Sequence, residues 1–130
     1  MSQYLYPAIF TPEDGLYNVT FPDLPDCYTC GDDLTDAMRM AQDVLADVLS
    51  DHEESGEAFA PASAPGDLDV PEGAVCSLVL VDTDAWRRAH STKAVKKTLT
   101  IPQWLNAAAE ARSVNFSQVL QDALRAQLGL

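Results

Sequence analysis

A short run near the carboxyl end of the chain, residues 95–102, combines side chains whose types and spacing suit contact with nucleic acid. Its hydrogen-bonding members are Lys96, Thr98 and Thr100, which share one face of a strand by the period of two, opposite apolar neighbours. That face presents one cation and two hydroxyls and no carboxylate. Lysine matches the acceptors of guanine, and threonine can bond to either base type or contact the methyl group of thymine. The run therefore predicts a strand able to contact base edges.

Two helical stretches follow this strand at once, at residues 103–112 and 116–128. A strand and two helices cannot bury a core alone, because a chain below about 40 residues usually needs a partner. A second copy is the natural partner, since two such strands paired antiparallel form a ribbon that fits the major groove of DNA. The alternative is an edge strand whose lysine serves solubility, packed on a helical hairpin. The apolar residues expected on the inner sides of the helices are Trp104, Leu105, Ala108, Ala109, Val119, Leu120, Ala123, Leu124 and Leu128.

This tail resembles the ribbon-helix-helix family of dimeric repressors. The resemblance implies that the lysine and the two threonines of the strand contact base edges, and that the second helix binds a phosphate at its N-terminus. Asn115 stands at the N-cap position of that helix, and Gln118 follows three residues later, as in a capping box. The free amides of Phe116 and Ser117 would then face the phosphate, aided by the helix dipole.

The net charge of −12 is unevenly distributed along the 130 residues. Residues 1–90 hold three basic and eighteen acidic residues, a net charge of −15, whereas residues 91–130 hold five basic and two acidic residues, a net charge of +3. The tail can therefore approach nucleic acid, and the acidic body would be repelled by it but would attract a basic protein. The sequence contains no apolar run of 18 residues and no recognisable secretory signal, so we expect no membrane span and a cytoplasmic location.

The body before the tail predicts an α+β domain. Strands are expected at residues 4–10, 16–21 and 27–30, then a helix, a flexible loop over about 53–73, and a strand at residues 75–81. Residues 12–15 predict the first turn, in which Pro12 sets one backbone angle and Gly15 can adopt positive φ. The two prolines of residues 21–26 predict a rigid bend. An antiparallel sheet with one packed helix is the fold class that this order indicates.

The long helix of the body begins after Asp33, its expected N-cap, and separates an apolar stripe from an acidic side. The stripe consists of Leu34, Ala37, Met38, Ala41, Val44, Leu45, Val48 and Leu49. The opposite side carries Asp36, Asp43, Asp47 and Asp51, and like charges four residues apart cost roughly 0.2–0.5 kcal/mol each in an isolated helix. Two interpretations stay open: a solvated face that keeps the protein soluble, and a surface that binds a basic partner.

Three cysteines are present, and the pair Cys27 and Cys30 has CxxC spacing. In a strand these two side chains point to opposite faces, and a second pair of ligands is missing, so we expect reduced thiols and no metal or cofactor. His52 and His90 are expected to be surface residues. Catalysis by a nuclease of the RNase H type would need clustered carboxylates on strands, whereas the aspartates lie mainly in turns and on a helix.

The segment FPDLPDC at residues 21–27, followed by GDDL at residues 31–34 and an alanine-rich acidic helix, resembles the HicB-type antitoxin family. The match covers almost all of residues 3–81, and the tail fits the branch of that family with a ribbon-helix-helix. The sequence departs from the commoner pattern at Asp26, where glycine is usual, and in its loop rich in alanine and proline.

The resemblance implies a trimmed RNase H-like domain (β-β-β-α-β) without nuclease function at residues 1–90 and a ribbon-helix-helix domain for dimerisation and DNA binding at residues 91–130. It implies a non-enzymatic antitoxin that covers a HicA-type mRNA-cleaving toxin, through an acidic surface for which we name Asp36, Asp43 and Asp47. It also implies repression of the protein's own operon as a homodimer, and leaves open whether dimers pair further. The alternative is a ribbon-helix-helix regulator whose first domain senses a small molecule.

Overall fold

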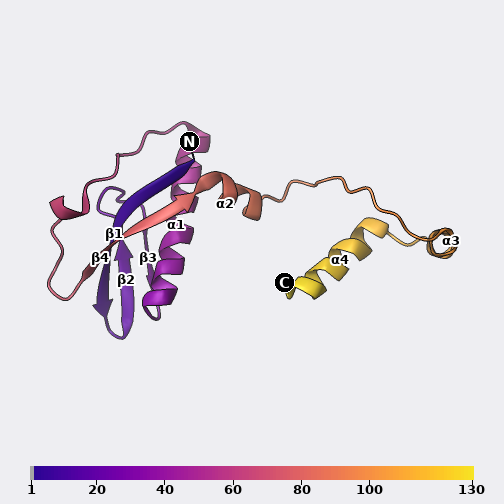
Figure 1. Ribbon diagram of the computed structural model, residues 1–130, viewed down its shortest axis with the longest axis horizontal. Helices are drawn as coiled ribbons and strands as arrows, with labels where there is room; N and C mark the ends of the chain where they lie inside the picture. The colour runs from indigo at the N-terminus through magenta and orange to yellow at the C-terminus, as the bar shows by residue number, and fades with distance from the viewer. Residues whose placement is uncertain (1) are drawn as a thin grey trace. The chain divides into compact units, whose positions relative to one another are not determined.

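The computed structural model describes residues 2–130, and its contacts divide the chain into two compact units (Figure 1). The first unit ends at Thr92, and the second unit spans Lys93–Leu130. No helix within residues 2–130 is both long enough and apolar enough to cross a membrane.

The first unit is an α+β domain, as the sequence predicts. Its sheet is antiparallel in the order β3-β2-β1-β4, and α1 lies against one face of it (Figure 1). Within the described residues the elements of this unit are β1 (Gln3–Glu13), β2 (Leu16–Thr20), β3 (Tyr28–Gly31), α1 (Leu34–Ser55), the short 3₁₀ turn η1 (Pro65–Asp67), β4 (Val75–Asp82) and α2 (Thr83–His90). The predicted order of three strands, a helix and a fourth strand is confirmed.

The hairpin between β1 and β2 turns more tightly than expected. Glu13 pairs with Leu16, so only Asp14 and Gly15 lie between the strands. Both residues have positive φ, 51° and 81°, as a two-residue type I′ turn requires. The role predicted for Gly15 is confirmed, whereas Pro12 belongs to β1 and not to the turn.

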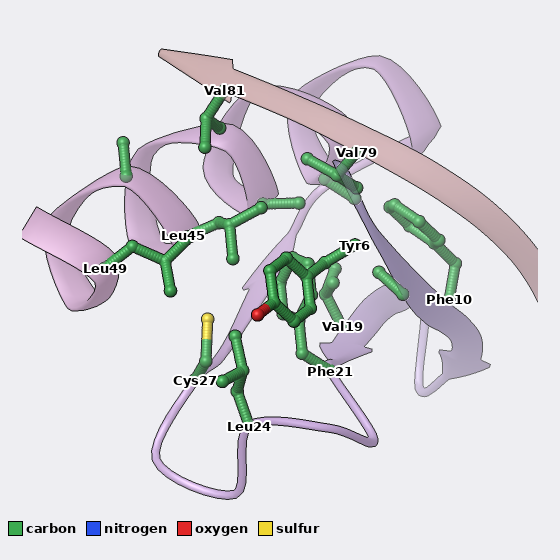
Figure 2. Close-up of a cluster of buried hydrophobic side chains, with 14 residues drawn as sticks. Tyr6, Phe10, Val19, Phe21, Leu24, Cys27, Leu45, Leu49, Val79 and Val81 are labelled. Atoms are coloured by element: carbon green, nitrogen blue, oxygen red, sulfur yellow. The ribbon is translucent and has the colours of Figure 1, made fainter. Parts of the chain in front are cut away.

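The core lies between the sheet and α1 (Figure 2). Alternate residues of β1 face the helix, and α1 contributes small and branched residues to the same cluster, because its apolar positions recur every three or four residues. Burying each large aliphatic or aromatic side chain contributes roughly 1.5–3 kcal/mol. The cluster includes Tyr6, Ala8, Phe10, Val19, Phe21, Leu24, Cys27, Ala37, Ala41, Leu45, Leu49, Val79 and Val81.

The bend over residues 21–27 is part of this core. Phe21, Leu24 and Cys27 are buried, and Figure 2 shows their side chains grouped at the foot of the cluster. The Leu24 amide donates to the Phe21 carbonyl at 2.9 Å, and the Cys27 amide donates to the Leu24 carbonyl at 3.0 Å. The bend thus satisfies its own backbone groups while it closes one end of the core.

Helix α1 begins as predicted and ends later than predicted. The Asp33 side chain accepts a hydrogen bond from the Asp36 amide at 2.7 Å, which confirms the N-cap. The helix continues to Ser55, three residues into the loop expected from residue 53, and Gly56 ends it at φ 72°. Leu34 was expected in the apolar stripe but is exposed. Ala46 and Ser50, outside that stripe, are buried, and the Arg87 guanidinium of α2 donates to the Ser50 hydroxyl at 3.3 Å.

The long loop between α1 and β4 is anchored to the domain. Phe59 packs against Tyr4, with ring centroids 5.6 Å apart in an edge-on arrangement. The Tyr6 hydroxyl donates to the Ala60 carbonyl, and the Ser63 amide donates to the Asp23 carboxylate at 2.9 Å. These contacts hold the first half of the loop to β1 and to the bend.

The second unit contains α3 (Gln103–Ala111) and α4 (Phe116–Leu128). The predicted helix ends are confirmed to within one residue. The strand predicted for residues 95–101 is wrong for the single chain: among residues 2–130 the sheet contains β1 to β4 alone, and residues 91–102 carry no strand. A strand is defined by hydrogen bonds to a neighbour, and this segment has no neighbouring strand within one copy.

Candidate nucleic-acid and protein interfaces

The segment with the predicted base-contacting residues is open to solvent on both sides. Lys96, Thr98 and Thr100 are all exposed, as their predicted role requires. The apolar neighbours that should face a core are exposed too, with Val95 at 80 % and Leu99 at 64 %. Polar and apolar residues therefore alternate along the segment, but within residues 2–130 of one copy nothing covers the apolar side.

The N-terminus of α4 has the predicted cap. The Asn115 side chain accepts a hydrogen bond from the Gln118 amide at 3.1 Å. The amides of Phe116 and Ser117, the first two positions of the helix, have no partner within residues 2–130, as is usual for a first turn. The capping box is only half formed, because the Gln118 side chain donates instead to the Asp122 carboxylate at 2.9 Å.

The helices of the second unit bury none of their residues within a single copy. Trp104 is 72 % exposed, and the other large residues of the predicted inner sides are exposed or only half-buried. An open groove of about 580 Å³ separates residues 94–97 from α4, with Val95, Lys96 and Leu120 among its lining residues. This unit therefore presents an uncovered apolar surface along both helices and the preceding segment.

The acidic residues singled out on α1 separate into two groups. The Asp36 carboxylate is used locally: it accepts from the Asp32 amide at 2.9 Å and lies 3.3 Å from the Arg39 guanidinium. Asp43 and Asp47 are exposed, and neither forms an ion pair within residues 2–130. Of the predicted trio, Asp36 therefore binds residues at the start of its own helix, whereas Asp43 and Asp47 form no ion pair in the described part of the chain.

Asp43 and Asp47 line an open groove of about 290 Å³ that the sequence did not reveal. Trp86 and His90 of α2 also line it, and their rings stack with centroids 4.2 Å apart and planes 17° from parallel. The only signal for this pair in the sequence is that two aromatic rings stand four residues apart, a spacing at which side chains meet on a helix. The remaining lining residues are Thr29, Met40 and Val44.

His52 is not a surface residue, contrary to the prediction. Its side chain is 13 % exposed, its Nε2 lies 3.1 Å from the Asp26 carboxylate, and its ring lies against Phe59 at 5.7 Å between centroids. Its Nδ1 lies 3.6 Å from the Glu57 carboxylate. The late end of α1 explains the difference, because the last turn of the helix places His52 beside Asp26 of the bend and Phe59 of the loop. His90 is exposed, as predicted.

The two cysteines of the CxxC pair lie in opposite environments. Cys27 is buried and Cys30 is exposed, as expected for side chains on opposite sides of the chain. Burial, with smaller contributions from the charges of Asp26 and Asp47, raises the pKa of the Cys27 thiol to about 12. This thiol is therefore unreactive at neutral pH. Within residues 2–130 no three His, Cys, Asp or Glu side chains are grouped so that they could hold a metal ion.

Comparison with known proteins places residues 6–124 in one family. They match the family model described as the HicB-like antitoxin of bacterial toxin–antitoxin systems. The chain is 28 % identical over 100 residues to antitoxin HicB 2 of Photorhabdus laumondii subsp. laumondii, an alignment that covers 75 % of this chain and 72 % of the relative.

Solved structures resemble the chain along almost its whole length, and two of them illustrate the similarity. One is a chain of a toxin–antitoxin complex from Streptococcus pneumoniae, with 27 % identity, a TM-score of 0.62 and coverage of 96 % of this chain and 99 % of that one. The other is the antitoxin HicB of Burkholderia pseudomallei, with 26 % identity, a TM-score of 0.55 and coverage of 97 % of each chain.

Proposed function

Since the chain belongs to the family of HicB-like antitoxins of bacterial toxin–antitoxin systems, we propose that it neutralises a HicA-type mRNA-cleaving toxin through its first unit and represses its own operon through its second. Both targets, the toxin and the operator DNA, lie in the cytoplasm. The observation that carries the proposal is the division of charge: an acidic α+β unit precedes a tail of net charge +3 whose apolar residues are uncovered.

The acidic unit suits the role of toxin inhibitor. A protein that cleaves RNA must bind phosphates and therefore presents positive charge on its active surface. A partner with a net charge of −15 over residues 1–90 complements that surface and is itself repelled by RNA. The proposal includes a fold for the first unit, a trimmed RNase H-like domain. In this role the fold is a binding scaffold and not a nuclease.

The second unit suits the role of a dimeric DNA-binding module. Pairing of two copies would give residues 95–101 the neighbouring strand that one copy lacks, and the same contact would cover Val95, Leu99 and the groove beside α4. In the resulting ribbon, Lys96, Thr98 and Thr100 of each copy face one major groove.

Phosphate contacts would fix the position of this ribbon on the duplex. The unpartnered amides of Phe116 and Ser117 point out of the first turn of α4, and Asn115 holds that turn in place by capping the Gln118 amide. Amides at a helix N-terminus favour an anion, and such contacts position a protein on DNA without reading its sequence.

The experiment that tests this proposal compares the full chain with a variant that ends at residue 92. The HicA-type toxin, a short basic protein that the proposal expects to be encoded beside this gene, is assayed for RNA cleavage with each form. Each form is also titrated against the promoter fragment in a gel-shift assay. We expect both forms to inhibit cleavage and only the full chain to bind the promoter. Loss of inhibition by the shortened chain, with its circular dichroism spectrum intact, would contradict the assignment of the two roles to the two units. A promoter affinity that changes with a small metabolite would support the regulator alternative instead.

A further inference from the structure

We propose that the groove between α1 and α2, lined by Asp43, Asp47, Trp86 and His90, binds an arginine side chain of the toxin. The inference rests on the proposed function and deepens it, because it assigns one part of the acidic unit to one contact. The four residues combine two carboxylates with a stacked pair of aromatic rings, a combination of charge and shape that the guanidinium group matches.

The carboxylates of the groove carry negative charge that no ion pair in the described part of the chain neutralises. Asp43 and Asp47 stand four residues apart on α1 and form no ion pair within residues 2–130. Their mutual repulsion opposes the helix slightly. By contrast, Arg39 pairs with Asp36, and Arg87 pairs with Glu53 and Asp84, so two of the three basic residues of the unit are engaged elsewhere. Among the described residues, His90 is the one lining residue of the groove with a basic side chain.

The apolar part of the groove suits the stem of a long basic side chain. Met40 is partly exposed and Val44 is half-buried, and both line the groove beside the carboxylates. Lysine and arginine bury their methylene groups along such surfaces while the charged head reaches a polar partner. A flat guanidinium can in addition stack on an aromatic face and bind a carboxylate with two hydrogen bonds, which an ammonium group cannot do.

The aromatic pair is held in place before any partner arrives. His90 Nδ1 lies 2.9 Å from the Trp86 carbonyl oxygen, which can only accept, so Nδ1 carries the proton and the ring is oriented over the indole. The Trp86 ring packs partly against the core, while its Nε1 atom is buried without a hydrogen-bond partner in the part of the chain that the structure describes. A rigid aromatic surface binds with little loss of side-chain entropy. Nucleic acid is a poor occupant, because both carboxylates would meet phosphate.

The two tryptophans of the chain provide the probe, since Trp86 lies in the first unit and Trp104 in the second. Full-length chain labelled with ¹⁵N is titrated with the neighbouring basic protein, and the indole N–H signals are assigned with a Trp86→Phe variant. We expect the Trp86 signal to shift or broaden in proportion to occupancy, and the Trp104 signal to stay where it is. A Trp86 signal that does not respond to saturating toxin would overturn the inference.

A matched pair of charge variants tests the carboxylates. The double variant Asp43→Asn/Asp47→Asn should bind the toxin roughly tenfold more weakly or worse, because each lost carboxylate removes a charge-assisted hydrogen bond. The control, Asp67→Asn/Asp69→Asn, removes the same charge from the exposed loop and should change the dissociation constant by no more than about twofold. An equal loss of toxin affinity in both variants would show that only the total negative charge of the chain matters, and would overturn the inference. If the unmodified chain does not bind the toxin at all, the proposed function fails together with the groove assignment.

Discussion

The Arg87 guanidinium lies 3.2 Å from the Glu53 carboxylate and ties α2 to the last turns of α1. The same guanidinium lies 2.8 Å from Asp84, and the Tyr4 hydroxyl donates to Glu53 at 2.9 Å, so the network joins both helices to β1. Burial alone would raise the pKa of Glu53, but hydrogen bonds with Thr83 and Tyr4 and the nearby Arg87 outweigh it and lower that pKa.

This network predicts a loss of stability in acid. A carboxylate whose pKa is lowered by folding stabilises the protein fully above its ordinary pKa of 4.5, and this contribution disappears as the pH falls through the lowered value. Glu53→Gln should therefore destabilise the domain by about 1 kcal/mol at neutral pH and flatten the decline of stability as the pH falls below 4.5 and through the lowered pKa. Urea unfolding at several pH values measures both effects. Glu54→Gln, at an exposed neighbour, is the control, and an unchanged acid decline in Glu53→Gln would contradict this account.

Close packing of β3 on α1 leaves no room for a side chain at Gly31. A Cβ atom there would lie 2.4 Å from the backbone nitrogen of Ala37 and 2.5 Å from its Cα, so the helix itself would have to shift. We expect Gly31→Ala to destabilise the domain by about 1–3 kcal/mol, the usual range for overpacking. Gly66→Ala is the matched control, because nothing lies within 4 Å of its added atom. Equal urea midpoints for the two variants would show that β3 and α1 are less closely packed than described.

The uncovered face of α4 predicts self-association that depends on its apolar residues. Leu124→Glu places a charge on the predicted inner side and should weaken dimerisation by at least about tenfold, because a buried unpaired carboxylate is costly. Gln118→Glu adds the same charge on the opposite side of the helix and should leave the dimer intact. Sedimentation equilibrium over a range of concentrations measures both. An unmodified chain that stays monomeric at high concentration would contradict a dimeric tail.

Lys96 is exposed, and its predicted role implies that replacing it lowers DNA affinity and leaves toxin binding unchanged. Lys96→Ala should weaken promoter binding by about 1–3 kcal/mol if the contact to a base is a good bidentate one. Toxin inhibition should persist, since the acidic unit is unaltered. A gel-shift titration measures the first effect, and an RNA-cleavage assay measures the second. Unchanged promoter affinity would remove Lys96 from the set of base-contacting residues.

Local signals in the sequence were sufficient for the order of the elements. Asp33 and Asn115 mark helix starts because their short side chains accept from amides two or three residues on, and Gly15 marks a turn because it tolerates positive φ. The period of the apolar residues located the face of α1 that covers the sheet. It could not predict the burial of Ser50, whose hydroxyl accepts from Arg87 of α2.

The sequence by itself therefore determined the class of fold, the division of charge and the family, since each of these follows from residues near one another in the chain. Only the tertiary structure decided that Asp43 and Asp47 share a groove with Trp86 and His90. The physical reason is distance along the chain: about forty residues separate Asp43 and Asp47 from the aromatic pair, and periodicity and helix caps report only on neighbouring residues. The structure of one copy likewise leaves residues 95–101 unpaired, because a strand exists only through the hydrogen bonds of its neighbour.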